Sequence, residues 1–260
     1  MSDFLEKGWT VFESEPAVRD WAKAALDVAK ERVQAPEERH WLRCEGTWFV
    51  GVDTLPNDPS GQVAGSEPLS GVAFAEASAL YGTLPLHRAQ VSVIYPGYPR
   101  PREGEGEAAF AYRLKRDAAH VDGLLAEGPD KRRYLKERHA YILGLPLSEA
   151  SRDASPLTVW DGSHHIMRAA FTDALKDVPQ ETWDQVDLTD VYKTTRRKVF
   201  ETCQRRVLPA RPGEAYLVHR LALHGVAPWG EEAKAPEEGR MIAYFRPEWP
   251  TPSDQWLTAP

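Results

Sequence analysis

The chain has 260 residues, of which 42% are hydrophobic and 27% charged, as in ordinary globular proteins. Nine Trp, nine Tyr and eight Phe exclude disorder over most of the chain. A net charge of −7 without a basic block excludes general nucleic-acid binding. No apolar run approaches the roughly 18 residues of a membrane span, so we expect neither nucleic acid nor membrane as a partner.

The two cysteines, Cys44 and Cys203, form neither a zinc-ligand spacing nor a disulfide framework. A chain with two distant cysteines suits a reducing compartment. The first residues lack a basic stretch followed by an apolar one, so no signal peptide is expected. These features predict a cytoplasmic protein.

The first third of the chain is expected to be mostly helical. Pro16 opens a stretch with apolar residues at helical spacing up to Val33, and residues 72–81 form a second helix candidate. Residues 47–52 are a short strand candidate, and residues 55–68 have the composition of a loop.

From about residue 88 the pattern changes to strands separated by turns, with helix candidates at 166–175 and 190–206. The expected strands are 89–95, 110–122, 140–145, 156–160, 214–219, 221–226 and 240–245. We therefore predict a single domain over residues 1–260, mainly β with helices. In it, a helical N-terminal layer (1–87) packs on a β-sandwich or barrel (88–250).

A metal site is suggested by His120 and Asp122, which point to the same face if they lie on a strand. One such pair is expected by chance in a chain with eight His and 39 acidic residues. His224 provides a third ligand, and two histidines with one carboxylate leave three positions open on an octahedral ion. That is the facial triad of non-haem Fe(II) oxygenases. The alternative is that His224 is a core histidine bonded to a backbone carbonyl.

Arg240 begins the strand candidate that follows His224. A planar guanidinium in an apolar pocket suits bidentate binding of a carboxylate. The alternatives are that Arg240 is a surface residue, or that Arg246, which has the same strand parity, has this role instead.

The order His120-x-Asp122, then His224, then Arg240 resembles the Fe(II)/2-oxoglutarate-dependent dioxygenases, specifically their phytanoyl-CoA dioxygenase-like branch. Residues 156–164, PLTVWDGSH, resemble the branch's "plxvxPGSH" segment, with Asp161 where Pro is usual. Residues 141–147 resemble the strand that precedes the conserved turn of this branch. Residues 212–215 resemble the "pGD" turn that leads into the strand of the distal histidine. The resemblance covers residues 88–247.

The resemblance implies a double-stranded β-helix, or jelly-roll, core. His120, Asp122 and His224 would hold Fe(II), and Arg240 would bind the far carboxylate of 2-oxoglutarate. With O2, the enzyme would hydroxylate a small molecule and release succinate and CO2. The family often has Ser or Thr two residues after the arginine, where this chain has Ile242. Thr158, on a neighbouring strand in the family's layout, is expected to supply the hydroxyl.

Tyr112 and Arg116 share the strand parity of His120 if residues 110–122 are one strand, and would then line the substrate pocket. Arg116 would meet an acidic substrate there, or else is an ordinary surface arginine. His164 and His165 are expected to have a structural role in a turn, because adjacent side chains diverge. Two alternatives to the oxygenase remain: a cupin-like metalloenzyme without 2-oxoglutarate, and a non-catalytic binding or sensor protein on the same fold.

Overall fold

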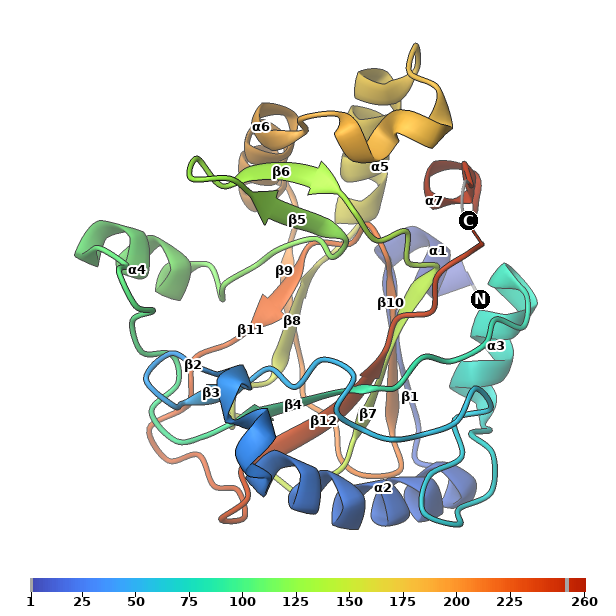
Figure 1. The fold of residues 1–260 in the computed structure, drawn as a ribbon, viewed down its shortest axis with the longest axis vertical. Coiled ribbons are helices and arrows are strands. Elements are labelled where there is room, and N and C mark those ends of the chain that lie inside the picture. The colour runs from blue at the N-terminus through green and yellow to red at the C-terminus, as the bar shows by residue number, and fades with distance from the viewer. Residues whose placement is uncertain (1, 251–252) are drawn as a thin grey trace.

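A computed structural model describes residues 2–250 and 253–260 (Figure 1). Its helices are α1 (Ser2–Lys7), α2 (Pro16–Gln34), α3 (Val72–Tyr81), α4 (Glu107–Lys115), α5 (Ser163–Leu175), α6 (Thr189–Thr202) and α7 (Gln255–Thr258), with 3-10 helices η1 (Pro36–Trp41) and η2 (Gln180–Gln185). Its strands are β1 (Trp9–Phe12), β2 (Leu42–Arg43), β3 (Trp48–Phe49), β4 (Gln90–Ile94), β5 (Leu124–Glu127), β6 (Arg132–Leu135), β7 (Tyr141–Pro146), β8 (Leu157–Trp160), β9 (Arg205–Leu208), β10 (Ala215–His219), β11 (His224–Val226) and β12 (Arg240–Phe245).

Two antiparallel sheets form the centre of the fold. The larger has the order β1-β10-β7-β12-β4-β3-β2 and the smaller the order β11-β8-β9, while β5 and β6 form a separate hairpin. Helix α2 runs along the larger sheet, and α5 and α6 lie at the opposite end of the molecule (Figure 1). The arrangement is a mixed helix and sheet fold with antiparallel sheets.

Side chains alternate between the two faces of β12, which separates the core into two parts. Met241, Ala243 and Phe245 belong to the main hydrophobic core, and the Phe245 ring lies 5.9 Å from the ring of Trp21 in α2. The residues of the other parity face the smaller sheet. They form a second cluster with Leu157 and Val159 of β8 and with residues of β7 and β10. This alternation also sends Arg240 and Arg246 to the inner face.

Most of the expected elements are confirmed. The helices predicted near 16–33, 72–81 and 166–175 correspond to α2, α3 and α5, and the strands predicted at 89–95, 140–145, 156–160, 214–219 and 240–245 correspond to β4, β7, β8, β10 and β12. The first 87 residues are less purely helical than expected, because β1, β2 and β3 pair into the larger sheet. The helix expected at 190–206 ends at Thr202, and β9 follows it.

The strand predicted over residues 110–122 is wrong. Helix α4 occupies Glu107–Lys115, a stretch in which Ala, Leu, Lys, Arg and Glu all favour helix. Asp117 and Ala118 then have positive φ angles of 52° and 54°, which break the regular backbone before His120. The strand expected at 221–226 is also shorter than expected, because β11 begins only at His224.

Among residues 2–250 and 253–260, no helix is both long enough and apolar enough to cross a membrane.

His164 has a structural role, as expected, but it lies at the start of helix α5 and not in a turn. Its Nε2 atom donates to the Leu5 carbonyl at 3.0 Å, which ties α5 to α1. Its ring lies 4.7 Å from that of His219 in β10. A Cβ atom on Gly8 would approach His164 Nδ1 to 2.5 Å, so glycine is required where the chain passes this ring. His164 is therefore part of the packing between α1, α5 and the larger sheet.

The buried state of His164 predicts a loss of stability in mild acid. Burial lowers the pKa of His164 from 6.5 to about 4, so the unfolded chain binds the proton first as the pH falls. The free energy of unfolding should therefore fall between pH 7.5 and 5.5, with His164 contributing about 1.4 kcal/mol of the loss. Urea unfolding at both pH values should show a smaller loss for His164→Gln. An equal loss in the variant and the wild type would contradict this assignment.

Candidate metal centre

The backbone itself joins the two histidine segments. His120 N donates to His224 O at 2.8 Å and His224 N donates to His120 O at 3.0 Å, which forms an isolated antiparallel bridge. The two imidazole rings consequently lie 4.6 Å apart. Gly225 permits this contact, because a Cβ atom there would meet the Asp117 carbonyl at 2.2 Å. The site is thus built where the chain after α4 crosses the start of β11.

His120, Asp122 and His224 present three ligand atoms to one point. One atom from each residue lies within 4.8 Å of the other two, and Asp122 Oδ1 is 3.2 Å from His120 Nε2 and 3.7 Å from His224 Nε2. The other ring nitrogens, Nδ1, lie 3.1 Å and 3.0 Å from the carbonyls of Ala118 and Ala222. Because a carbonyl only accepts, each Nδ1 carries the proton and each Nε2 keeps its lone pair for a metal.

The electrostatics keep Asp122 and His224 in the protonation states that metal binding needs. Burial alone would raise the pKa of Asp122, but Arg246 and the two histidines hold it well below its usual range. Burial lowers the pKa of His224 to about 4, so its imidazole is neutral at neutral pH. An ionised carboxylate beside neutral imidazole is the donor set of a divalent transition-metal site.

The triad separates two spaces. An inner cavity of about 180 Å³ lies between the sheets and has an apolar wall that includes Ile142 and Tyr244. An outer pocket of about 370 Å³ lies between α4, α6 and the β5–β6 hairpin. His120 and Asp122 line both spaces. A metal held by the triad would therefore be reachable from the inner cavity and from the outer pocket.

Arg246 lies at the metal end of β12. Its Nη1 atom is 3.2 Å from Asp122 Oδ2, and its other terminal nitrogen donates to the side chain of Gln90. Arg246 therefore binds the carboxylate oxygen that faces away from the histidines, and both of its terminal nitrogens already have partners.

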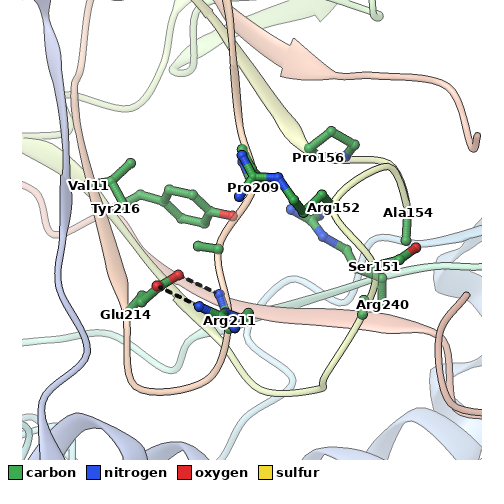
Figure 2. Close-up of a pocket in the computed structure, with 12 residues that line it drawn as sticks. Val11, Ser151, Arg152, Ala154, Pro156, Pro209, Arg211, Glu214, Tyr216 and Arg240 are labelled. Atoms are coloured by element: carbon green, nitrogen blue, oxygen red, sulfur yellow. Dashed lines mark hydrogen bonds and ion pairs between the residues drawn. The ribbon is translucent and has the colours of Figure 1, made fainter. Parts of the chain in front are cut away.

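Arg240 lies at the other end of β12, beside a third pocket of about 220 Å³ (Figure 2). Its side chain is buried, with the residue only 6% exposed, and both terminal nitrogens lack a hydrogen-bond partner among the described residues. The hydroxyl of Tyr216, which lines both this pocket and the inner cavity, also lacks one. Arg211 and Glu214 form an ion pair at the rim. Arg240 is thus a buried cation with unused donors.

The structure does not bring Thr158 to the cavity as expected. Its neighbours Leu157 and Val159 face the inner cluster, so the alternation of β8 sends Thr158 to the other face. Ser92 of β4, which pairs with Ile242 in the register of β4 and β12, lines the inner cavity instead. Ser92 was not among the residues predicted from the sequence, although the alternation of the strand at 89–95 could have indicated it.

Tyr112 and Arg116 do line the outer pocket, but not as residues of one strand. Tyr112 lies on α4 and Arg116 is the C-cap of that helix. The opposite wall of the pocket, where Arg196 and Phe200 project from α6, was not predicted from the sequence. Nothing in the local sequence of α6 connects it to the segment around His120.

No family model and no curated protein matches the chain. Solved structures similar to it include the epimerase SnoN in complex with Fe3+, alpha ketoglutarate and nogalamycin RO (16% identity, TM-score 0.48, covering 98% of this chain and 86% of that one). Another is the non-heme alpha ketoglutarate dependent carbocyclase SnoK from nogalamycin biosynthesis (14% identity, TM-score 0.47, covering 94% of this chain and 82% of that one). A third is AviO1 from Streptomyces viridochromogenes Tue57 (16% identity, TM-score 0.47, covering 96% of each chain).

The geometry of the triad predicts that a divalent metal ion stabilises the fold. Mn(II) at 100 times its dissociation constant should raise the free energy of unfolding by about 2.7 kcal/mol, because only the folded chain assembles the three ligands. Thermal unfolding of His224→Ala should show no such increase. The matched control His165→Ala removes an exposed histidine and should respond as the wild type does. A full metal response in His224→Ala would remove His224 from the site.

Proposed function

We propose that the chain is an Fe(II)- and 2-oxoglutarate-dependent oxygenase that hydroxylates a small molecule on a jelly-roll core. The observation that carries the proposal is the convergence of His120, Asp122 and His224, with one ligand atom from each within 4.8 Å. Two histidines and one carboxylate on one side of an ion leave the open positions that a cosubstrate and O2 require. The order of the motifs in the sequence supports the same function.

The protein's own contribution is to hold and orient. His120 Nε2, His224 Nε2 and the Asp122 carboxylate would ligate Fe(II), and the Nδ1 bonds to backbone carbonyls fix both imidazole planes. Arg246 anchors the carboxylate through its second oxygen. When bound, Fe(II) and 2-oxoglutarate supply the activation of O2 that yields succinate, CO2 and a hydroxylated product. The apolar inner wall, which includes Ile142 and Tyr244, would limit the water that surrounds this chemistry.

Arg240 is the better of the two arginines for the far carboxylate of 2-oxoglutarate. Both terminal nitrogens of Arg240 are buried without a partner, whereas those of Arg246 are already bonded. A buried cation without a partner is costly unless an anion pairs with it. The Tyr216 hydroxyl, also unpaired, lies toward Arg240 from the inner cavity and would donate to the same carboxylate.

A second candidate function is a cupin-like metalloenzyme that uses the same triad without 2-oxoglutarate. The observation that favours it is the position of Arg240, which lines the pocket at the far end of β12 rather than the inner cavity. Ile242, where the resembling family often has Ser or Thr, also lies between Arg240 and the metal end of the strand.

The wider setting is also part of the proposal. We place residues 1–260 in one domain with its core at 88–250, which the pairing of β1 with β10 and of β3 with β4 supports. A cytoplasmic location agrees with Cys44 and Cys203, which are both free.

An anaerobic titration with Fe(II) and then 2-oxoglutarate tests the proposed function. The wild type should develop a weak visible charge-transfer band that requires both additions, and His224→Ala should show none. Arg240→Met should need roughly 10- to 100-fold more 2-oxoglutarate for the same band, since it removes a charge-assisted bond to the carboxylate.

Arg152→Met is the matched control, because Arg152 lines the same pocket as Arg240 but is exposed. It should need the wild-type concentration of 2-oxoglutarate. Iron binding without the band would favour the cupin-like enzyme. If the protein binds iron and 2-oxoglutarate but consumes no O2 with any substrate, it is a sensor and not an oxygenase.

A further inference from the structure

We propose that the outer pocket binds a substrate that carries an anionic oxygen group, a carboxylate or a phosphate, between Arg116 and Arg196. This inference rests on the proposed function and names the substrate class of the same site. The two arginines belong to different elements, the C-cap of α4 and the middle of α6, and both line the pocket that reaches His120.

The outer pocket is cationic although the chain as a whole has a net charge of −7. Its lining contains six arginines and three acidic residues, namely Arg102, Arg113, Arg116, Arg133, Arg196, Arg246, Asp117, Asp122 and Glu137. Two of the acids are neutralised locally, Asp122 by Arg246 and Asp117 by Arg205. A concave surface with an excess of one charge concentrates ligands of the opposite charge.

Arg116 is held in place without using its hydrogen-bond donors. Its guanidinium carbon lies 4.6 Å from the ring centre of Tyr112 and 4.3 Å from that of Phe200. In the part of the chain that the structure describes, no carboxylate pairs with it. Ring contacts on the flat faces leave the N–H edge of a guanidinium free for bidentate binding of an oxyanion.

Arg196 faces the same place from α6. Its guanidinium carbon lies 5.9 Å from the Tyr112 ring and 5.2 Å from the Tyr192 ring. Its Nη1 atom donates to the Ala119 carbonyl at 3.3 Å, directly before His120 in the chain. Its Nε atom is buried without a partner among the described residues. Arg196 therefore links the proposed anion site to the backbone that carries the metal ligand.

Arg113 shows what a satisfied arginine looks like in this pocket. It forms a bidentate pair with Glu105, at 2.8 Å and 2.7 Å, and also donates to the Arg100 carbonyl. Arg116 and Arg196 have no comparable acidic partner within the described ranges, although both contact the Tyr112 ring. Arg113 therefore has a structural role, whereas Arg116 and Arg196 are available to a ligand.

The remaining walls suit the apolar part of such a substrate. Trp48 and Val226 line both the outer pocket and the inner cavity, so an apolar group could extend from the arginines past His120. The anionic end would then fix the substrate while its apolar end lies beside the triad. A small organic anion with an aromatic or aliphatic body fits this distribution of charge and apolar surface.

Phenyl phosphate and phenylacetate are suitable probes, with the neutral 2-phenylethanol for comparison. Calorimetry on the Mn(II)-loaded protein should show binding of both anions and not of the alcohol. Arg116→Gln and Arg196→Gln should each weaken anion binding at least about 10-fold, because each removes charge-assisted bonds. Mn(II) affinity should stay unchanged in Arg116→Gln, because the Arg116 side chain contacts the rings of Tyr112 and Phe200 and not the segment that carries the metal ligands.

The control variant Arg197→Gln removes the next arginine of α6, which is exposed, and should bind the anions as the wild type does. Bound Mn(II) should also broaden the phosphorus resonance of phenyl phosphate, which places the anion near the triad. This broadening should be lost in Arg116→Gln, in which the metal is still bound.

Equal anion affinity in Arg116→Gln, Arg196→Gln and Arg197→Gln would overturn the anion site, as would Mn(II) binding without any effect on the phosphorus resonance. If the wild-type protein does not bind Mn(II), the proposed function is overturned instead. In that case the calorimetry still decides the anion site, through the difference between Arg116→Gln and Arg197→Gln.

Discussion

The candidate site depends on one backbone interaction, the pair of hydrogen bonds between His120 and His224. It joins an irregular segment after α4 to the first residue of β11, and it sets the spacing of the two imidazoles. Asp122 then follows two residues later and faces both rings. Since neither segment brings all three ligands together alone, the site exists only when this bridge has formed.

Strand β12 connects the site to the rest of the molecule. Its outward residues pack on α2 through contacts such as Phe245 with Trp21, so the position of the strand is fixed by the core. Its inward residues place one arginine beside Asp122 and another, with unused donors, at the far end. The two arginines thus lie at opposite ends of one strand. Arg246 orients the metal ligand Asp122, and Arg240 is available to bind an anion.

Much of the fold could be predicted because the signal for strands such as β7 and β12, a short apolar run bounded by Gly or Pro, is local. The three triad residues were likewise visible as residue types in a particular order. The strand expected at 110–122 was wrong because the helix-forming composition of α4 determines the local structure, so the strand parity assigned to Tyr112 and Arg116 does not apply. Arg196 could not be assigned from spacing, because its place in the outer pocket depends on how α6 packs against distant elements.

The walls of the outer pocket come from α4, α6 and the β5–β6 hairpin, whereas the triad lies on the bridge and β11. Arg196 and Tyr192 of α6 bond the backbone on either side of His120, but replacing other side chains of these elements, such as Tyr112 and Phe200, would alter which molecule is accepted without removing a bond to the metal-ligand segment. Selection could therefore act on substrate choice and on the reaction centre as nearly independent traits. During evolution, surface residues of two helices and one hairpin could therefore change while the residues of the candidate metal site stay the same.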